Sequence, residues 1–171
     1  MSAPIYVGRW RVDLIVREGV RSPVSRMVLA RAVAAALDLV AAPSPASIGL
    51  ILSSDAELTE LNAAHMGKDG PTDVLSFPLL PPDAFAVGAP PPDVPRPPRS
   101  RIHLGDIIVS VERAREQAET GHGGQTGEVR WSVADELRLL VTHGTLHICG
   151  QDHAEPDQEA AMRALERQLL A

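Results

Sequence analysis

Residues 143–153 read HGTLHICGQDH and hold three of the chain's six histidines. On a helix, positions i and i+4 lie on one face a turn apart, so His143 and His147 can bind one ion. Gly150 can end this helix in a left-handed cap, because glycine adopts positive φ at little cost. The turn brings His153 back towards the other two. Three imidazoles with an open fourth position are typical of a catalytic zinc site.

The same histidine spacing occurs in the metzincin zinc motif, HExxHxxGxxH, with one difference. Where that motif has the glutamate that activates the zinc-bound water, this chain has Gly144. A hydrolase built on these histidines therefore needs another proton acceptor, and a purely structural role for the histidines stays open. Cys149 follows His147 by two residues and so points away from the line of the two helical histidines. We interpret it as a small buried apolar side chain and not as a fourth ligand.

The composition is typical of one globular domain over residues 1–171, because 44% of the residues are hydrophobic. The longest apolar run, 32–37, is far shorter than the ~20 residues of a membrane-spanning helix, so we expect no membrane association. The first residues lack the pattern of a secretory signal, and one cysteine permits no internal disulfide. Both features favour a cytoplasmic location. A net charge of −6 argues against non-specific coating of nucleic acid, but it leaves room for a local basic cleft.

Hydrophobic periodicity predicts four strands and five helices. The strands are expected at 9–16, 47–53, 74–77 and 102–110. The helices are expected at 25–40, 56–66, 111–119, 128–149 and 157–170. Ser25 and Ser110 are candidate N-caps, and Pro156 takes a permitted first-turn position. Because strands and helices alternate early in the chain, at least one parallel pair is expected. We predict an α/β (α+β) fold with a small mixed four-stranded sheet.

Residues 79–100 contain eight of the fifteen prolines, and proline excludes regular helix and central strand. We expect a long surface loop within the single domain. Three arginines, Arg96, Arg99 and Arg101, follow at its end and form the densest basic patch of the chain. They are either a solvated loop end or a phosphate contact.

Three stretches in series resemble the YbeY family of bacterial single-strand-specific endoribonucleases. Segment 143–153 is similar to that family's H-G-x-L-H-x-x-G-Y-D-H signature, and PTDVLSFP (71–78) and LGDIIVS (104–110) resemble its second and third motifs. The resemblance implies one zinc ion per chain, held by His143, His147 and His153. It further implies a cytoplasmic enzyme that matures ribosomal RNA, especially the 3′ end of the small-subunit RNA, and that acts in ribosome quality control. The implied partners are ribosomal RNA and the small ribosomal subunit, without a small-molecule cofactor.

Two departures from the family pattern bear on activity. Gln151 stands where the family has tyrosine, and His65-Met66 stands where it usually has Tyr-Arg. The family's arginine is expected to face the metal cleft and hold RNA phosphate, which Met66 cannot do.

Two further residues are candidates for the catalytic machinery. Lys68 could supply a displaced positive charge. Asp152 is a candidate proton acceptor, or a turn residue that orients a histidine. Three hypotheses follow: a zinc-dependent endoribonuclease, a zinc-stabilised ribosome-associated factor without strong nuclease activity, and a zinc peptidase.

Overall fold

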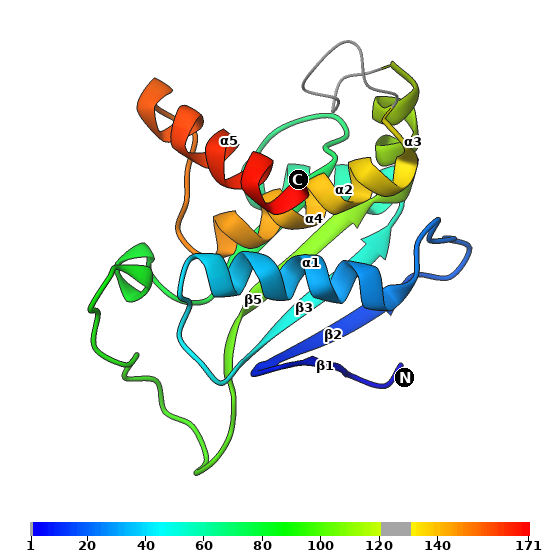
Figure 1. Cartoon of the computed structure of the whole chain (residues 1–171). Coiled ribbons are helices and arrows are strands. Elements are labelled where there is room, and N and C mark those ends of the chain that lie inside the picture. The colour runs from blue at the N-terminus through cyan, green and yellow to red at the C-terminus, as the bar shows by residue number, and fades with distance from the viewer. Residues whose placement is uncertain (1, 121–130) are drawn as a thin grey trace.

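The computed structural model describes residues 2–120 and 131–171, and its central feature is one mixed sheet (Figure 1). The strands are β1 (Ile5–Val7), β2 (Trp10–Val16), β3 (Ala46–Ser53), β4 (Val74–Pro78) and β5 (Ile102–Ser110). They lie in the order β1-β2-β3-β5-β4, in which β2, β3 and β5 are parallel and the two outer strands are antiparallel to their neighbours. The predicted mixed sheet and its parallel pairing are confirmed.

The strand β1 was not predicted, so the described sheet has five strands instead of four. Three residues are too short to carry an alternating pattern of their own. The strand forms because it pairs with β2, with Val7 opposite Trp10 across a turn that contains Gly8. Gly8 has a φ of +57°, a value that suits glycine.

The described part of the chain contains five α-helices, as predicted: α1 (Arg26–Leu39), α2 (Asp55–Leu61), α3 (Val111–Thr120), α4 (Val133–Ile148) and α5 (Pro156–Leu170). A π-helical turn, η1 (Asn62–Met66), continues α2, and a 3-10 turn, η2 (Pro82–Phe85), follows β4. The side chain of Ser25 caps α1 by accepting from the backbone N–H of Val28. Residues 128–130 of the predicted fourth helix lie outside the described residues.

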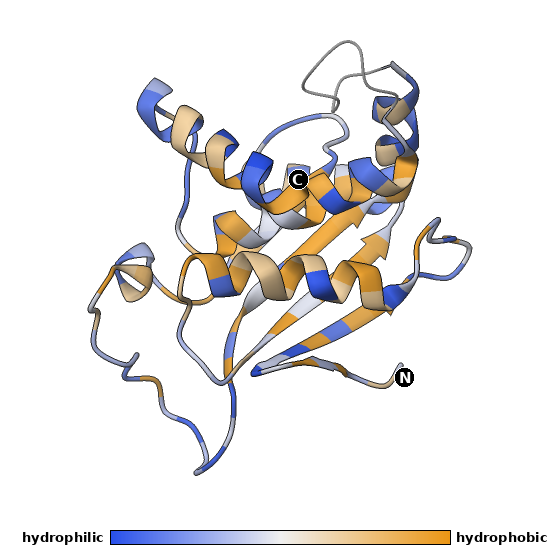
Figure 2. Ribbon diagram, viewed as in Figure 1, coloured by the Kyte–Doolittle hydropathy of each residue, from blue (hydrophilic) through white to orange (hydrophobic). Residues whose placement is uncertain are grey.

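Helices α1 and α4 lie side by side over one face of the sheet (Figure 1). The alternating residues Trp10, Val12 and Leu14 of β2 point into this layer and are buried, while the intervening residues are more accessible. Figure 2 shows the same alternation as bands of hydropathy along the strand. Burial of this apolar area, at about 25 cal/mol per Å², is the main stabilisation of the layer.

Two smaller apolar clusters place the remaining helices. On the opposite face of the sheet, Leu58 of α2 packs against Leu75 and Ile108. Helix α5 packs on α4 and α1 through Met162, which contacts a cluster that includes Leu146. This packing brings α5 next to the histidine-bearing end of α4.

Between β4 and β5 the chain forms the turn η2 and otherwise neither helix nor strand. This proline-rich segment is still attached to the body, because Leu80 is buried in the main core and Phe85 packs against it. Among the described helices, none is both long and apolar enough to cross a membrane.

Candidate metal centre

The C-terminal half of α4 carries two of the three histidines and lies unusually close to the sheet. A Cβ atom added to Gly144 would lie 2.7 Å from Cγ2 of Ile107 and 3.1 Å from Cγ2 of Val74. The Ser76 hydroxyl donates to the Gly144 carbonyl at 3.0 Å, which joins β4 to the helix. Position 144 therefore faces the sheet, and no larger side chain fits there. This contact counts against the peptidase hypothesis, because a glutamate at this position would have no room.

The end of α4 has the capping arrangement that the sequence predicted. Gly150 has a φ of +82°. Its N–H donates to the carbonyl of His147 at 3.0 Å, and the N–H of Gln151 donates to that of Leu146 at 3.0 Å. These two bonds define a Schellman cap. The cap reverses the chain, so that His153 returns to the face of the helix that carries the other two histidines.

The structure brings together all three histidines that the spacing singled out. One ring nitrogen from each of His143, His147 and His153 lies within 4.8 Å of the others. The Nε2 atoms of His143 and His147 are 3.0 Å apart. The first two side chains are half-buried and the third is exposed, so one side of the cluster faces solvent. Converging imidazole nitrogens with an accessible side fit a divalent metal ion with an open ligand position.

Helix α5 supplies a carboxylate that orients the first histidine. The Nδ1 atom of His143 donates to Oε1 of Glu166 at 2.6 Å, and Glu166 is buried. In the neutral ring this bond places the proton on Nδ1 and leaves Nε2 of His143, 3.0 Å from Nε2 of His147, as the ligand atom, as in carboxylate–histidine–metal triads. The sequence analysis did not predict this role of Glu166, because Glu166 lies 23 residues after His143 in the chain. Glu166 comes four residues after Met162 and so lies on the same face of the terminal helix, which is the signal that could have pointed to it.

The surroundings of the second histidine favour its neutral form. Burial lowers the pKa of His147, and the neighbouring His143 and His153 lower it further, while backbone contact with Gln151 and the charge of Asp152 oppose the shift. A neutral imidazole is the form that binds a metal. The ring is therefore ready to bind a metal ion at neutral pH without first losing a proton.

A groove of about 800 Å³ runs over the histidine cluster. One wall comes from the segment between η1 and β4, and the other from the end of α4 and the turn after it. Both catalytic candidates, Lys68 and Asp152, line this groove, as do Met66 and Gln151. The three arginines at the end of the proline-rich segment are not among its lining residues.

Of the two catalytic candidates, Asp152 is part of the turn that carries His153, and Lys68 lies at the surface. Oδ1 of Asp152 accepts from the backbone N–H of His153 at 2.7 Å, so this carboxylate stabilises the turn. Lys68 is exposed. His65 packs edge-on against Phe77 with ring centres 5.3 Å apart. Cys149 is buried, which raises the pKa of its thiol to about 12. It behaves as the small apolar side chain that was expected.

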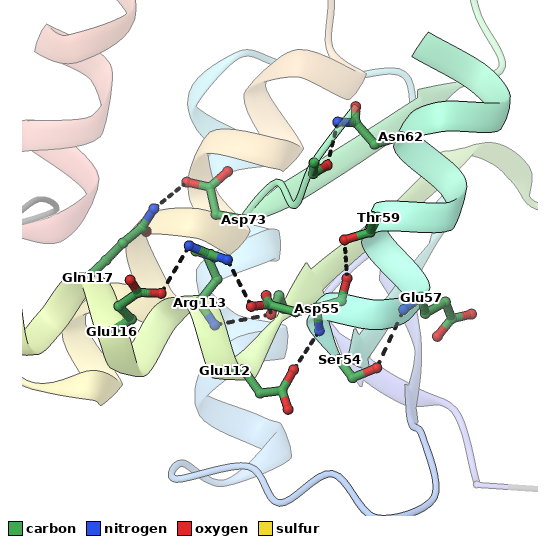
Figure 3. Close-up of polar contacts among 12 residues, drawn as sticks. Ser54, Asp55, Glu57, Thr59, Asn62, Asp73, Glu112, Arg113, Glu116 and Gln117 are labelled. Atoms are coloured by element: carbon green, nitrogen blue, oxygen red, sulfur yellow. Dashed lines mark hydrogen bonds and ion pairs between the residues drawn. The ribbon is translucent and has the colours of Figure 1, made fainter. Parts of the chain in front are cut away.

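The wall that carries Lys68 is anchored by Asn62. This buried side chain donates to the carbonyl of Gly70 at 3.1 Å (Figure 3). The backbone carbonyl of Asn62 accepts from the N–H groups of Gly67 and Lys68. Gly67 has a φ of +62°, and the π-helical turn before it is a distortion that recurs at functional sites. The loop between η1 and β4 is therefore held at both ends.

A polar network behind the groove fixes Asp73 (Figure 3). Gln117 of α3 donates to Oδ2 of Asp73 at 3.0 Å, and the N–H of Ser110 donates to its carbonyl at 2.8 Å. Ser110 also bonds Asp55, which pairs with Arg113 at 2.9 Å. The network links α2, α3, β5 and the start of β4, so it holds the groove wall rigid.

The fold and the site together define a class: an α/β protein with a candidate three-histidine metal centre at the base of an open groove. The model of the family described as Endoribonuclease YbeY matches residues 19–171. The chain therefore belongs to this family.

Two curated relatives and one solved structure illustrate the similarity. The chain is 38% identical over 161 residues to Endoribonuclease YbeY of Roseiflexus sp. (strain RS-1), covering 93% of this chain and 90% of that protein. It is 42% identical over 137 residues to Endoribonuclease YbeY of Salinispora tropica, covering 80% of each. The solution structure of TM1509 from Thermotoga maritima aligns with a TM-score of 0.53 at 22% identity, over 93% of this chain and 86% of that one. This last comparison supports the fold alone.

Proposed function

We propose that this chain is a metal-dependent endoribonuclease that cleaves single-stranded RNA and matures the 3′ end of small-subunit ribosomal RNA. We further propose that it works in the cytoplasm, on the small ribosomal subunit, and takes part in ribosome quality control. The single observation that carries the proposal is the convergence of His143, His147 and His153 in a groove, in a chain of this family. Its relatives are named as endoribonucleases.

The three histidines would hold one zinc ion. When bound, such an ion lowers the pKa of a water molecule and polarises a phosphoryl oxygen. Glu166 keeps His143 in the tautomer that offers Nε2. Gly144 lets the helix approach the sheet, so that the histidines lie at the base of the groove beside β4.

Lys68 is proposed to neutralise phosphate. Among the described residues that line the groove, it is the one lysine or arginine, and the carboxylates Asp69, Asp73 and Asp152 line the groove too. An ammonium ion is a point charge with three donors, so it attracts a phosphate without the bidentate geometry of a guanidinium. Asp152 remains the candidate proton acceptor, since it borders the groove next to His153.

Single-turnover cleavage tests the proposal with a matched pair of histidine variants. Purified zinc-loaded protein is given a single-stranded RNA carrying the small-subunit 3′ end, and the same RNA as a duplex. We expect cleavage of the single strand, and a loss of at least ~100-fold in His147→Ala, in line with the effect of removing central catalytic groups. His103→Ala is the control, because His103 contacts Ser47 and Asp106 on the sheet and does not line the groove. Equal activity in both variants contradicts the proposal.

A second candidate function is a zinc-stabilised ribosome-associated factor with little nuclease activity. The observation in its favour is Met66, which lines the groove where the family pattern carries arginine. In the same assay, Met66→Arg is expected to raise cleavage if phosphate neutralisation limits this chain. If zinc removal lowers the melting temperature but wild type and Met66→Arg both leave RNA intact, the factor hypothesis replaces the nuclease.

A further inference from the structure

A second cavity, of about 250 Å³, adjoins the histidine cluster on the side of α3 and α5. It shares Asp73, His143 and His153 with the groove, so the two spaces meet at the cluster. Pockets for drug-sized molecules are about 300–1,000 Å³, so this smaller space suits a single flat ring. We call it the side pocket.

The walls of the side pocket are apolar on one side and acidic on the other. Leu139, Leu140 and Met162 supply the apolar wall, and each is buried. Glu136 supplies a carboxylate that is only 1% exposed. Apolar walls with a few fixed polar groups are the usual construction of a site for a ring-shaped ligand.

Among the described residues, one oxygen of the Glu136 carboxylate is hydrogen-bonded and the other is not. Trp131 Nε1 donates to Oε2 at 2.7 Å. Within residues 2–120 and 131–171, no hydrogen bond reaches the other oxygen, Oε1. The pocket therefore favours a ligand that brings an N–H group to this oxygen.

The lining of the pocket argues against a phosphate group and against a second metal ion as its ligand. Asp73, Glu136 and Glu166 repel a phosphate group, and the one arginine among the described residues that line the pocket, Arg163, is paired with Glu159 at 2.5 Å. A second metal ion is not supported either, because the three histidines are the only cluster with metal-binding geometry among the described residues. What remains is a neutral ring that donates hydrogen bonds.

We propose that the side pocket binds one base of the RNA next to the cleaved bond and favours cytosine over uracil. This inference rests on the proposed nuclease function, because the pocket opens at the histidine cluster. The exocyclic amino group of cytosine donates to a carboxylate, whereas uracil places a carbonyl oxygen at the same position. Packing against Leu139 and Met162 holds the ring, as aromatic and apolar side chains hold an extruded base in enzyme pockets.

The protonation of Glu136 is compatible with this role. Burial raises the pKa of its carboxyl group to about 7, and the nearby charge of Asp73 raises it too, while the Trp131 hydrogen bond opposes the shift. The ionised form accepts from the amino group. The neutral form can in addition donate to the ring nitrogen N3 of cytosine, which is an acceptor, whereas N3 of uracil carries a proton.

Oligocytidylate and oligouridylate of equal length test the inference, because their bases differ only in the group at C4 and in the proton on N3. Binding is measured by fluorescence anisotropy with the zinc-loaded protein, and cleavage by initial rates on the same oligomers. We expect about tenfold tighter binding of oligocytidylate, which is the low end of discrimination by a good hydrogen-bonded base contact. Glu136→Gln, which is nearly isosteric, is expected to reduce the preference to within about twofold. Glu60→Gln, an exposed carboxylate on α2 outside both cavities, is the control.

The outcomes separate the pocket from the nuclease activity. A preference that depends on Glu136, without cleavage, supports the pocket and contradicts the proposed function. Cleavage with equal use of both oligomers contradicts the pocket and leaves the function in place. A cytosine preference that survives Glu136→Gln, or a Glu136→Gln protein that keeps its melting temperature but binds neither oligomer, also overturns the inference.

Discussion

Two glycines determine the shape of the histidine site, and each acts through a different physical requirement. Gly144 has an ordinary helical position, but the sheet lies too close for any side chain. Gly150 has a left-handed backbone, and an added Cβ would also lie 2.9 Å from the Cα of Pro82. The conformational requirement of Gly150 could be predicted from the sequence. The steric requirement of Gly144 could not, because Ile107 and Val74 are distant in the chain.

Replacing Gly150 with alanine should lower the free energy of unfolding by more than the cost of a left-handed alanine, because the added Cβ would also meet Pro82. Gly88 is a matched control, because its φ is +76° and nothing lies within 4 Å of an added Cβ. A left-handed alanine costs of order 1–3 kcal/mol, and Gly88→Ala should show no more than this. Gly150→Ala should lose more unfolding free energy in urea melts and should also bind zinc more weakly, since His153 moves. Equal losses of stability with unchanged zinc affinity would show that the Pro82 contact is unimportant.

At the scale of elements, α5 has two roles at the site. It supplies Glu166 to His143, and it forms part of the side pocket through Met162, Glu159 and Arg163. Its existence and its first-turn proline followed from the sequence. Its position against the end of α4 did not, because a 15-residue amphipathic helix can pack in many places.

Removing the charge of Glu166 should weaken the metal site without unfolding the protein. Glu166→Gln keeps the side-chain shape but makes a weaker partner for His143, and loss of such partners typically lowers metal affinity 10–100-fold. Zinc affinity is measured by competition with a chromophoric chelator, and the melting temperature of the metal-free protein is measured in parallel. Glu159→Gln is the control, since Glu159 pairs with Arg163 at the surface of the same helix. If the two variants bind zinc equally well, Glu166 does not orient the ligand.

At the scale of the whole molecule, the buried carboxylate of Glu136 should make stability depend on pH. Burial raises the pKa of this group to about 7 in the folded protein, compared with a reference value of 4.5. The folded state therefore binds more protons than the unfolded state between these values. It follows that the stabilisation is fully present below about pH 4.5 and is lost as the pH rises through 7. The other described charged or titratable groups that line this pocket are Asp73 before β4, His143 and His153 of the histidine cluster, and Glu159, Arg163 and Glu166 on α5.

Urea melts at several pH values check this expectation. Between pH 5 and pH 8, wild type should lose roughly 1–3 kcal/mol more unfolding free energy than Glu136→Gln. Glu60→Gln should follow the wild-type profile, because it lies exposed on α2. Parallel pH profiles for all three proteins would mean that Glu136 titrates normally in the folded state.

The sequence alone was sufficient where the physics is local. Helical periodicity put His143 and His147 on one face, the glycine cap returned His153 to them, and strand and helix patterns predicted the mixed sheet with parallel strands. Tertiary structure decided the rest: the pairing that creates β1, the approach of α4 to Ile107, the carboxylate of Glu166, and the side pocket around Glu136. Each of these depends on segments that are far apart in the chain. Local periodicity specifies which face of an element is buried, but only packing specifies which other element it meets.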